Sequence, residues 1–218
     1  MSDTLQNKIK AIDAEVQRLH FKWKYFKQVF GTNEKVSLLN DTAPVFFSYL
    51  WNSMLFDILL SIARLLDPRE SFRKENLSFE NLLSEISDNS LSVELSKLIS
   101  ELKGKAHAIE IWRNKKLGHN DLSHSMGDIP LPPVQVNDLT EALTITRKIM
   151  NLLHQRLNFP TVIYEGCFLS EPGDGNSLLF HLKYGFDASR EDYRNSDVRR
   201  EMEISNWLER QTKKKGEI

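Results

Sequence analysis

The chain has 218 residues, enough for one large domain or one domain with an appendage, and 40% of them are hydrophobic. Lysine and arginine total 29 against 30 aspartate and glutamate residues, so no global charge marks a nucleic-acid or membrane binder. Cys167 is the only cysteine, which excludes an internal disulfide and a cysteine-based zinc site and fits a reducing cytosol. The polar start of the chain lacks the pattern of a secretory signal, and we therefore expect a cytoplasmic protein with no membrane segment.

A long amphipathic helix is expected at the start of the chain, ending at Gly31. Its apolar residues follow alternating steps of four and three, as in the seam of a coiled coil, and this seam is a candidate dimer surface. The opposite face carries lysines beside aromatic residues, which is typical either of a solvated face or of an RNA groove. The seam residues are Leu5, Ile9, Ile12, Val16, Leu19, Trp23, Phe26 and Phe30, and the lysines are Lys22, Lys24 and Lys27.

A second, strongly apolar helix is expected from Pro44, with Asp41 or Thr42 as its cap. The few polar residues within it favour a buried central helix over a membrane span. The Asp67-Pro68 pair stops it. Arg64 and Asp67 are three residues apart and can pair on one face, either as a structural ion pair or as support for an active site.

The centre of the chain is expected to hold a short helix capped by Ser78 and a long helix from about Val93 to about Leu117. Gly104 interrupts the long helix and marks either a kink or a close contact with another helix. Three prolines exclude regular structure from the loop that follows.

The pattern changes toward the end of the chain. A fourth major helix, capped by Asn137 or Asp138, is followed by a β-branched and aromatic stretch, 161–169, that is a candidate short strand. One more short helix is expected before Gly185. The sequence therefore predicts an all-α bundle with a long N-terminal helix over residues 1–158, and a small C-terminal appendage with a short β segment over residues 159–218.

The stretch WRNKKLGHND carries the clearest chemistry. Arginine can grip a phosphate with two parallel hydrogen bonds, and histidine can accept or donate a proton near neutral pH. Arg113 and His119 would not share a face of an ideal helix, but Gly118 offers a left-handed cap at which the chain can reverse.

Such a pair suits attack of an RNA 2′-hydroxyl on the adjacent phosphorus, without a metal or other cofactor. The expected products are a 2′,3′-cyclic phosphate and a free 5′-hydroxyl. Lys115 and Lys116 add positive charge for RNA, and Asn114 can orient a substrate oxygen or the imidazole.

The spacing of this motif is weak by itself, because about one such pair is expected by chance. Arg147 and His154 also match it, within one unbroken predicted helix, and we interpret that pair as helix surface. A metal site is another interpretation of the loop after the motif, but no helical spacing organises its ligands and we expect none. The residues concerned are His119, Asp121, His124 and Asp128.

Arg113, Asn114 and His119 resemble the motif of the HEPN superfamily, an arginine followed by a few variable residues and a histidine. Three blocks in order resemble its AbiU-type abortive-infection branch, over roughly residues 5–185. They are TAPVFFSYLWNSMLFDILLSIARLLDP, NLSFENLL and WRNKKLGHND. The resemblance implies a helical bundle that usually forms a homodimer, with the Arg–His pairs of two subunits facing one cleft.

The resemblance further implies a metal-independent endoribonuclease of a toxin–antitoxin or phage-defence system, with RNA as its substrate; an antitoxin protein is a candidate partner that the sequence leaves open. Arg113 and His119 are then the catalytic candidates and Asn114 supports them. One subgroup carries a tyrosine two residues after the histidine, which a nucleotidyltransferase modifies; Asp121 stands there, so this regulation is not expected. The alternative is a non-catalytic module of the same fold that binds RNA or a protein.

Overall fold

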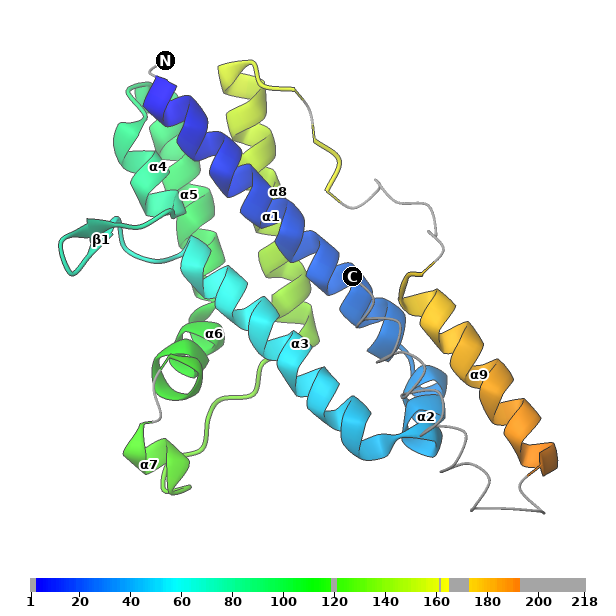
Figure 1. Cartoon of the computed structure of the whole chain (residues 1–218). Helices are drawn as coiled ribbons and strands as arrows, with labels where there is room; N and C mark the ends of the chain where they lie inside the picture. The colour runs from blue at the N-terminus through cyan, green and yellow to red at the C-terminus, as the bar shows by residue number, and fades with distance from the viewer. Residues whose placement is uncertain (1–2, 119–120, 161, 165–172, 193–218) are drawn as a thin grey trace, which may run out of the picture.

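The computed structural model describes residues 3–118, 121–160, 162–164 and 173–192, with side chains described between residues 4 and 185 of these ranges. Within them the chain is mostly helical, which confirms the all-α fold class (Figure 1). The elements are α1 (Asp3–Phe30), α2 (Asn33–Thr42), α3 (Pro44–Leu65), β1 (Glu70–Ser71), β2 (Lys74–Glu75), α4 (Phe79–Glu85), α5 (Asn89–Lys105), α6 (His107–Trp112), the π-helical turn η1 (Arg113–Leu117), α7 (Leu122–Ser125), α8 (Val136–Leu157) and α9 (Gly175–Asp192).

The bundle is organised around two helix pairs, α1 with α3 and α5 with α8, and α1 also packs on α4 and α8 (Figure 1). The apolar seam predicted for α1 packs in the interior of the bundle. Its residues Ile9, Ile12, Val16 and Leu19 have no exposed surface. This seam faces the protein's own core, so the expectation that it forms a dimer surface is wrong.

The helix α3 is central only in its second half. Ile58 and Ile62 are completely buried in the core, whereas Val45, Phe46 and Tyr49 in the first half are 84%, 59% and 73% exposed. Among the described helices, α3 is long and apolar enough to cross a membrane by length and composition alone. A core helix passes the same test, and the buried second half fits that explanation. The expectation of a helix buried throughout is wrong for the first half.

Residues before α3 form a helix that the sequence pattern does not predict. Thr32 caps this helix, α2, because its hydroxyl accepts a hydrogen bond from the backbone N–H of Lys35 at 3.4 Å. Leu39 of α2 packs in a small second core with Leu179 of α9. The sequence predicts Asp41 or Thr42 as the cap of α3, but α3 follows directly after Ala43, so neither residue caps it.

The long central helix is broken at Ala106 and not at Gly104. Ala106 is fully buried and has φ −92° and ψ 5°, which turns the chain from α5 into α6. A Cβ atom built on Gly104 would meet no other atom within 4 Å, so this glycine marks neither a kink nor a close contact. The start is also earlier than expected, at a cap formed by Asp88.

Other boundaries are set by residues outside the expected caps. Ser78 caps α4 as expected, accepting from the N–H of Asn81 at 3.3 Å. However, α8 begins after Gln135, upstream of both predicted cap residues. The one-turn helix α7 lies in the stretch predicted as a loop, and the short hairpin β1–β2 precedes α4. The helix α9 continues through Gly185 instead of ending there.

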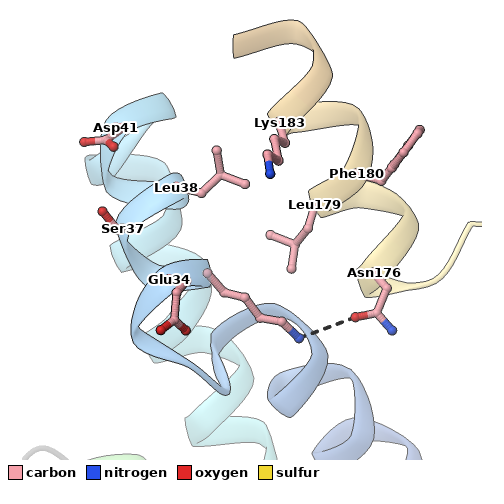
Figure 2. A pocket seen from close by; sticks show the side chains of 9 residues that line it. Glu34, Ser37, Leu38, Asp41, Asn176, Leu179, Phe180 and Lys183 are labelled. Atoms are coloured by element: carbon pink, nitrogen blue, oxygen red, sulfur yellow. Dashed lines mark hydrogen bonds between the residues drawn. The ribbon is translucent and has the colours of Figure 1, made fainter. Parts of the chain in front are cut away.

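The C-terminal appendage is described only in part. Most of the candidate strand 161–169 lies outside the described residues, and its described part, 162–164, forms no strand. The helix α9 packs on α1 and α2. Figure 2 shows the open pocket between α2 and α9, with Leu38 and Leu179 facing each other and Lys183 at its rim. The boundary at residue 158 remains a prediction.

Candidate active site

Arg113 begins the wide turn η1 at the end of α6. The N–H of Gly118 donates to the carbonyl oxygen of Arg113 at 2.7 Å, a bond that spans five residues instead of the four of an α-helix. Such π-type turns shift the side chains that follow relative to an α-helix, and they are frequent at functional sites. The α-helical geometry therefore ends just before Arg113, the residue that we expect to bind phosphate.

Gly118 closes this turn, but not as the left-handed cap that the sequence predicts. Its φ of −92° and ψ of −29° lie in the right-handed region. Glycine is required for another reason, because a Cβ atom at this position would lie 2.9 Å from the carbonyl oxygen of Arg113. His119 lies outside the described residues, so its return toward Arg113 stays a prediction.

Gly118→Ala should therefore destabilise the protein by about 1–3 kcal/mol, the usual cost of forcing an extra methyl group into a close contact. Urea denaturation monitored by circular dichroism measures the change. Gly104→Ala is the matched control: it fills open space on an exposed helix position and should stabilise the protein by up to about 1 kcal/mol. Equal effects of the two substitutions would contradict the tight turn.

The guanidinium of Arg113 is held on two sides. Its Nη2 donates to Oδ1 of Asp67 at 2.7 Å, and its Nη1 donates to Oδ1 of Asn114 at 2.9 Å. The side chain of Arg113 is 42% exposed and that of Asp67 only 18%, so the carboxylate fixes the arginine from the protein side. Among the described residues Asp67 pairs with Arg113, and not with Arg64 as one expectation had it. Its position supports the other expectation, a supporting role beside the site.

The two lysines of the motif have different surroundings. Lys115 donates to Oδ2 of Asp121 at 3.0 Å, so its charge is already compensated. Lys116 is exposed, and it makes no ion pair within the part of the chain that the structure describes. Of the two predicted RNA contacts, Lys116 is thus the one whose charge is available.

Asp121 also holds a histidine. Its Oδ1 lies 2.9 Å from Nδ1 of His124 and accepts from the backbone N–H of the same residue at 3.3 Å, which caps α7. Hydrogen bonds from His124 and Lys115 hold the pKa of the Asp121 carboxyl well below its usual range. The sequence pattern suggested these residues only as metal ligands. Within the described residues, no group of three or more His, Cys, Asp or Glu side chains is placed to hold a metal ion.

The second arginine–histidine pair does not form helix surface as expected, because His154 is buried. Its Nε2 lies 3.6 Å from Oδ1 of Asp13 on α1, and the hydroxyl of Tyr164 donates to the same carboxylate oxygen. Burial is the main cause that raises the pKa of the Tyr164 hydroxyl, and its hydrogen bond to Asp13 raises that pKa further. His154 therefore belongs to a buried polar group that joins α8 and the residues after it to α1.

The structure thus shows an all-α bundle in which Asp67 and Asn114 hold an arginine at the end of α6. Residues 2–166, most of the chain, match the family HEPN_AbiU2, described as AbiU2, and the chain belongs to this family. No curated protein and no solved structure matches the chain. The resemblance to the AbiU-type branch is thereby confirmed, and with it the link to abortive infection.

Proposed function

We propose that this protein is a metal-independent endoribonuclease of an abortive-infection or toxin system. The observation that carries the proposal is the arrangement of Arg113, which Asp67 and Asn114 hold in place while its side chain is 42% exposed. Because the side chain is already held in one orientation, it loses little conformational entropy when it binds phosphate oxygens. Membership of the HEPN AbiU2 family supports the same chemistry.

In the proposed reaction the 2′-hydroxyl of RNA attacks the adjacent phosphorus. The bond from phosphorus to O2′ forms as the bond to O5′ breaks, which gives a 2′,3′-cyclic phosphate and a free 5′-hydroxyl. His119 accepts the proton of the 2′-hydroxyl, and the remaining N–H groups of Arg113 stabilise charge on the phosphoryl oxygens. Lys116 contributes a contact to the RNA backbone outside the reacting phosphate.

The test uses two substrates of the same sequence, an RNA and a version with 2′-deoxynucleotides, both in the presence of EDTA. Cleavage of the RNA and survival of the deoxy version are the expected results, because only the RNA carries the attacking hydroxyl. Binding of varied RNAs without any cleavage would contradict the enzyme and establish the alternative, a non-catalytic binding module.

Asp67→Asn should lower kcat/KM for RNA cleavage on the order of tenfold, because the amide keeps the size of the side chain but loses the charged hydrogen bond to Arg113. Glu94→Gln is the matched control, since Glu94 forms a comparable surface ion pair with Arg156. An Asp67→Asn enzyme as active as the control would show that the carboxylate does not position the arginine.

We also propose that the protein acts as a cytoplasmic homodimer, with an antitoxin protein restraining it. The residues next to the motif support the dimer, because Leu122, Met126 and Ile129 are 75%, 71% and 51% exposed. Exposed apolar residues close together in the chain are consistent with an interaction surface. Because α7 packs against η1, a second copy bound there would bring two motifs close together.

Met126→Lys should therefore shift the protein from dimer to monomer, because the substitution places a charge in the apolar contact. Sedimentation velocity at micromolar concentration measures the change. Tyr184→Lys, at an equally exposed aromatic position on α9, is the control and should leave the dimer intact. A wild-type protein that sediments as a monomer would contradict the proposed assembly.

A further inference from the structure

The hairpin between α3 and α4 holds two side chains at its tip in an unfavourable backbone conformation. Its strands pair antiparallel with Ser71 opposite Lys74, so Phe72 and Arg73 form the loop. Their φ angles are 51° and 64°, in the left-handed region that a tight hairpin loop requires and that an Asn-Gly sequence normally supplies. A bulky side chain such as phenylalanine is a clear outlier there. The local needs of the turn therefore do not explain these two residues.

Contacts to the rest of the protein hold the base of the hairpin. The amide of Asn76 donates to the carbonyl oxygen of Pro68 and to the hydroxyl of Ser71, both at 2.8 Å. The carboxylate of Glu75 accepts from the ammonium of Lys8 on α1 at 3.1 Å. Because the base is held on both strands, the tip projects from the bundle in a defined direction.

The tip presents an aromatic ring beside positive charge. Phe72 is 100% exposed. Arg73 and Lys74 are also exposed, and neither forms an ion pair within the part of the chain that the structure describes. The acidic residues of the hairpin, Glu70 and Glu75, lie one pair further from the tip. Single-stranded RNA is bound by surfaces of this kind, because its bases stack on aromatic rings and its phosphates contact cations.

The hairpin leaves the bundle next to the candidate active site. Phe72 follows Asp67, the partner of Arg113, by five positions, so the Cα atoms of Phe72 and Asp67 are at most about 18 Å apart. Figure 1 shows the hairpin projecting from the same side of the bundle as α6 and α7. One RNA strand can therefore contact both Arg113 and the tip.

We propose that the hairpin tip is a binding subsite for single-stranded RNA, in which an unpaired base stacks on Phe72 and a phosphate pairs with Arg73. This inference rests on the proposed function, from which it takes the RNA substrate. The tip holds the strand beside the cleaved bond and takes no part in the chemical step. The subsite explains why Phe72 and Arg73 stand where Asn-Gly would form the turn more easily.

Replacing the tip by the sequence that the turn prefers separates binding from folding. The double variant Phe72→Asn/Arg73→Gly should keep or raise the thermal midpoint, because both new residues tolerate a positive φ. It should weaken binding of a single-stranded RNA of about 12 nucleotides by about 10- to 100-fold, the contribution of one stacked base. The RNA for binding carries 2′-O-methyl groups, which prevent cleavage. With unmodified RNA the loss should appear in KM and leave kcat unchanged.

The single variants distinguish stacking from charge. Phe72→Ala should weaken RNA binding without changing its dependence on salt. Arg73→Gln should reduce the slope of log K against log salt concentration by about 0.7, the value for one phosphate contact on a single strand. Fluorescence anisotropy over a salt series measures both. Phe180→Ala, at a phenylalanine 60% exposed on α9, is the control and should bind RNA as the wild type does.

A double variant that binds RNA as tightly as the wild type overturns the subsite. If that variant also loses self-association, the tip is a protein contact instead. An Arg73→Gln variant with the wild-type salt slope likewise overturns the phosphate contact. If the wild type binds RNA through the tip but cleaves none, the ribonuclease function fails and the subsite stands. If the wild type cleaves RNA and the double variant matches its KM, the ribonuclease function stands and the subsite fails.

Discussion

His119→Ala should lower the rate of RNA cleavage by about 1,000-fold, within the range that a positioned acid or base contributes. In the proposed reaction this residue accepts the proton of the attacking 2′-hydroxyl, and alanine leaves that proton to water. The loss should appear in the single-turnover rate, which isolates the chemical step from binding and product release. RNA binding should remain close to wild type, because Arg113 and Lys116 are unchanged.

His107→Ala is the control for this experiment. His107 is an exposed histidine on α6, six residues before Arg113, and takes no part in the proposed reaction. Its substitution should leave cleavage unchanged. If His119→Ala and His107→Ala both cleave RNA at the wild-type rate, His119 is not the base and the motif is not catalytic in the proposed way.

Arg113→Lys should reduce cleavage by about 100- to 1,000-fold, the usual loss when one donor to a developing charge is removed. Lysine keeps the positive charge but not the planar fork of N–H groups. It cannot contact Asp67, Asn114 and a phosphate in the same geometry that Arg113 allows. A large effect from this conservative change would therefore show that directional hydrogen bonds, and not charge alone, stabilise the transition state.

Arg156→Lys provides the comparison. Arg156 is 39% exposed and pairs with Glu94, so it matches Arg113 in exposure and in having a carboxylate partner. Its substitution should change neither the single-turnover rate nor stability by a measurable amount, because exposed ion pairs contribute little. Equal activity of the two lysine variants would contradict the phosphate contact.

The features of the fold that sequence predicted correctly depend on local chemistry. The seam of α1 and the cap at Ser78 follow from residues close together in the chain. The errors come from distant contacts. The helix α2 has few apolar residues, and its Leu39 is buried among residues distant in sequence, including Leu179 of α9. The break at Ala106 likewise occurs at a residue with strong helical preference, inside the packed core.

The candidate site was predictable in part for the same reason. Arg113 and Asn114 are neighbours, and their contact follows from the motif. Asp67 is distant in sequence, so spacing could show only that it belonged to some ion pair. The pairing of Asp121 with His124 has a local signal in the sequence, an acidic cap three residues before a histidine.

His154 shows the limit of motif spacing. It matches the loose arginine–histidine pattern with Arg147, and helical position alone suggested an exposed residue. Its burial depends on Asp13 from α1 and on Phe159, whose ring stacks against it, and neither contact is visible in the spacing. The surroundings of a histidine, and not its distance from an arginine, distinguish the two pairs.

The chemical ends of the RNA fragments test the central claim most directly. Wild-type protein is incubated with RNA in EDTA, and the fragments are analysed by mass spectrometry. Attack by the 2′-hydroxyl predicts a 2′,3′-cyclic phosphate on one fragment and a free 5′-hydroxyl on the next. Fragments that end in a 3′-hydroxyl and a 5′-phosphate, or RNA that remains intact, would contradict it.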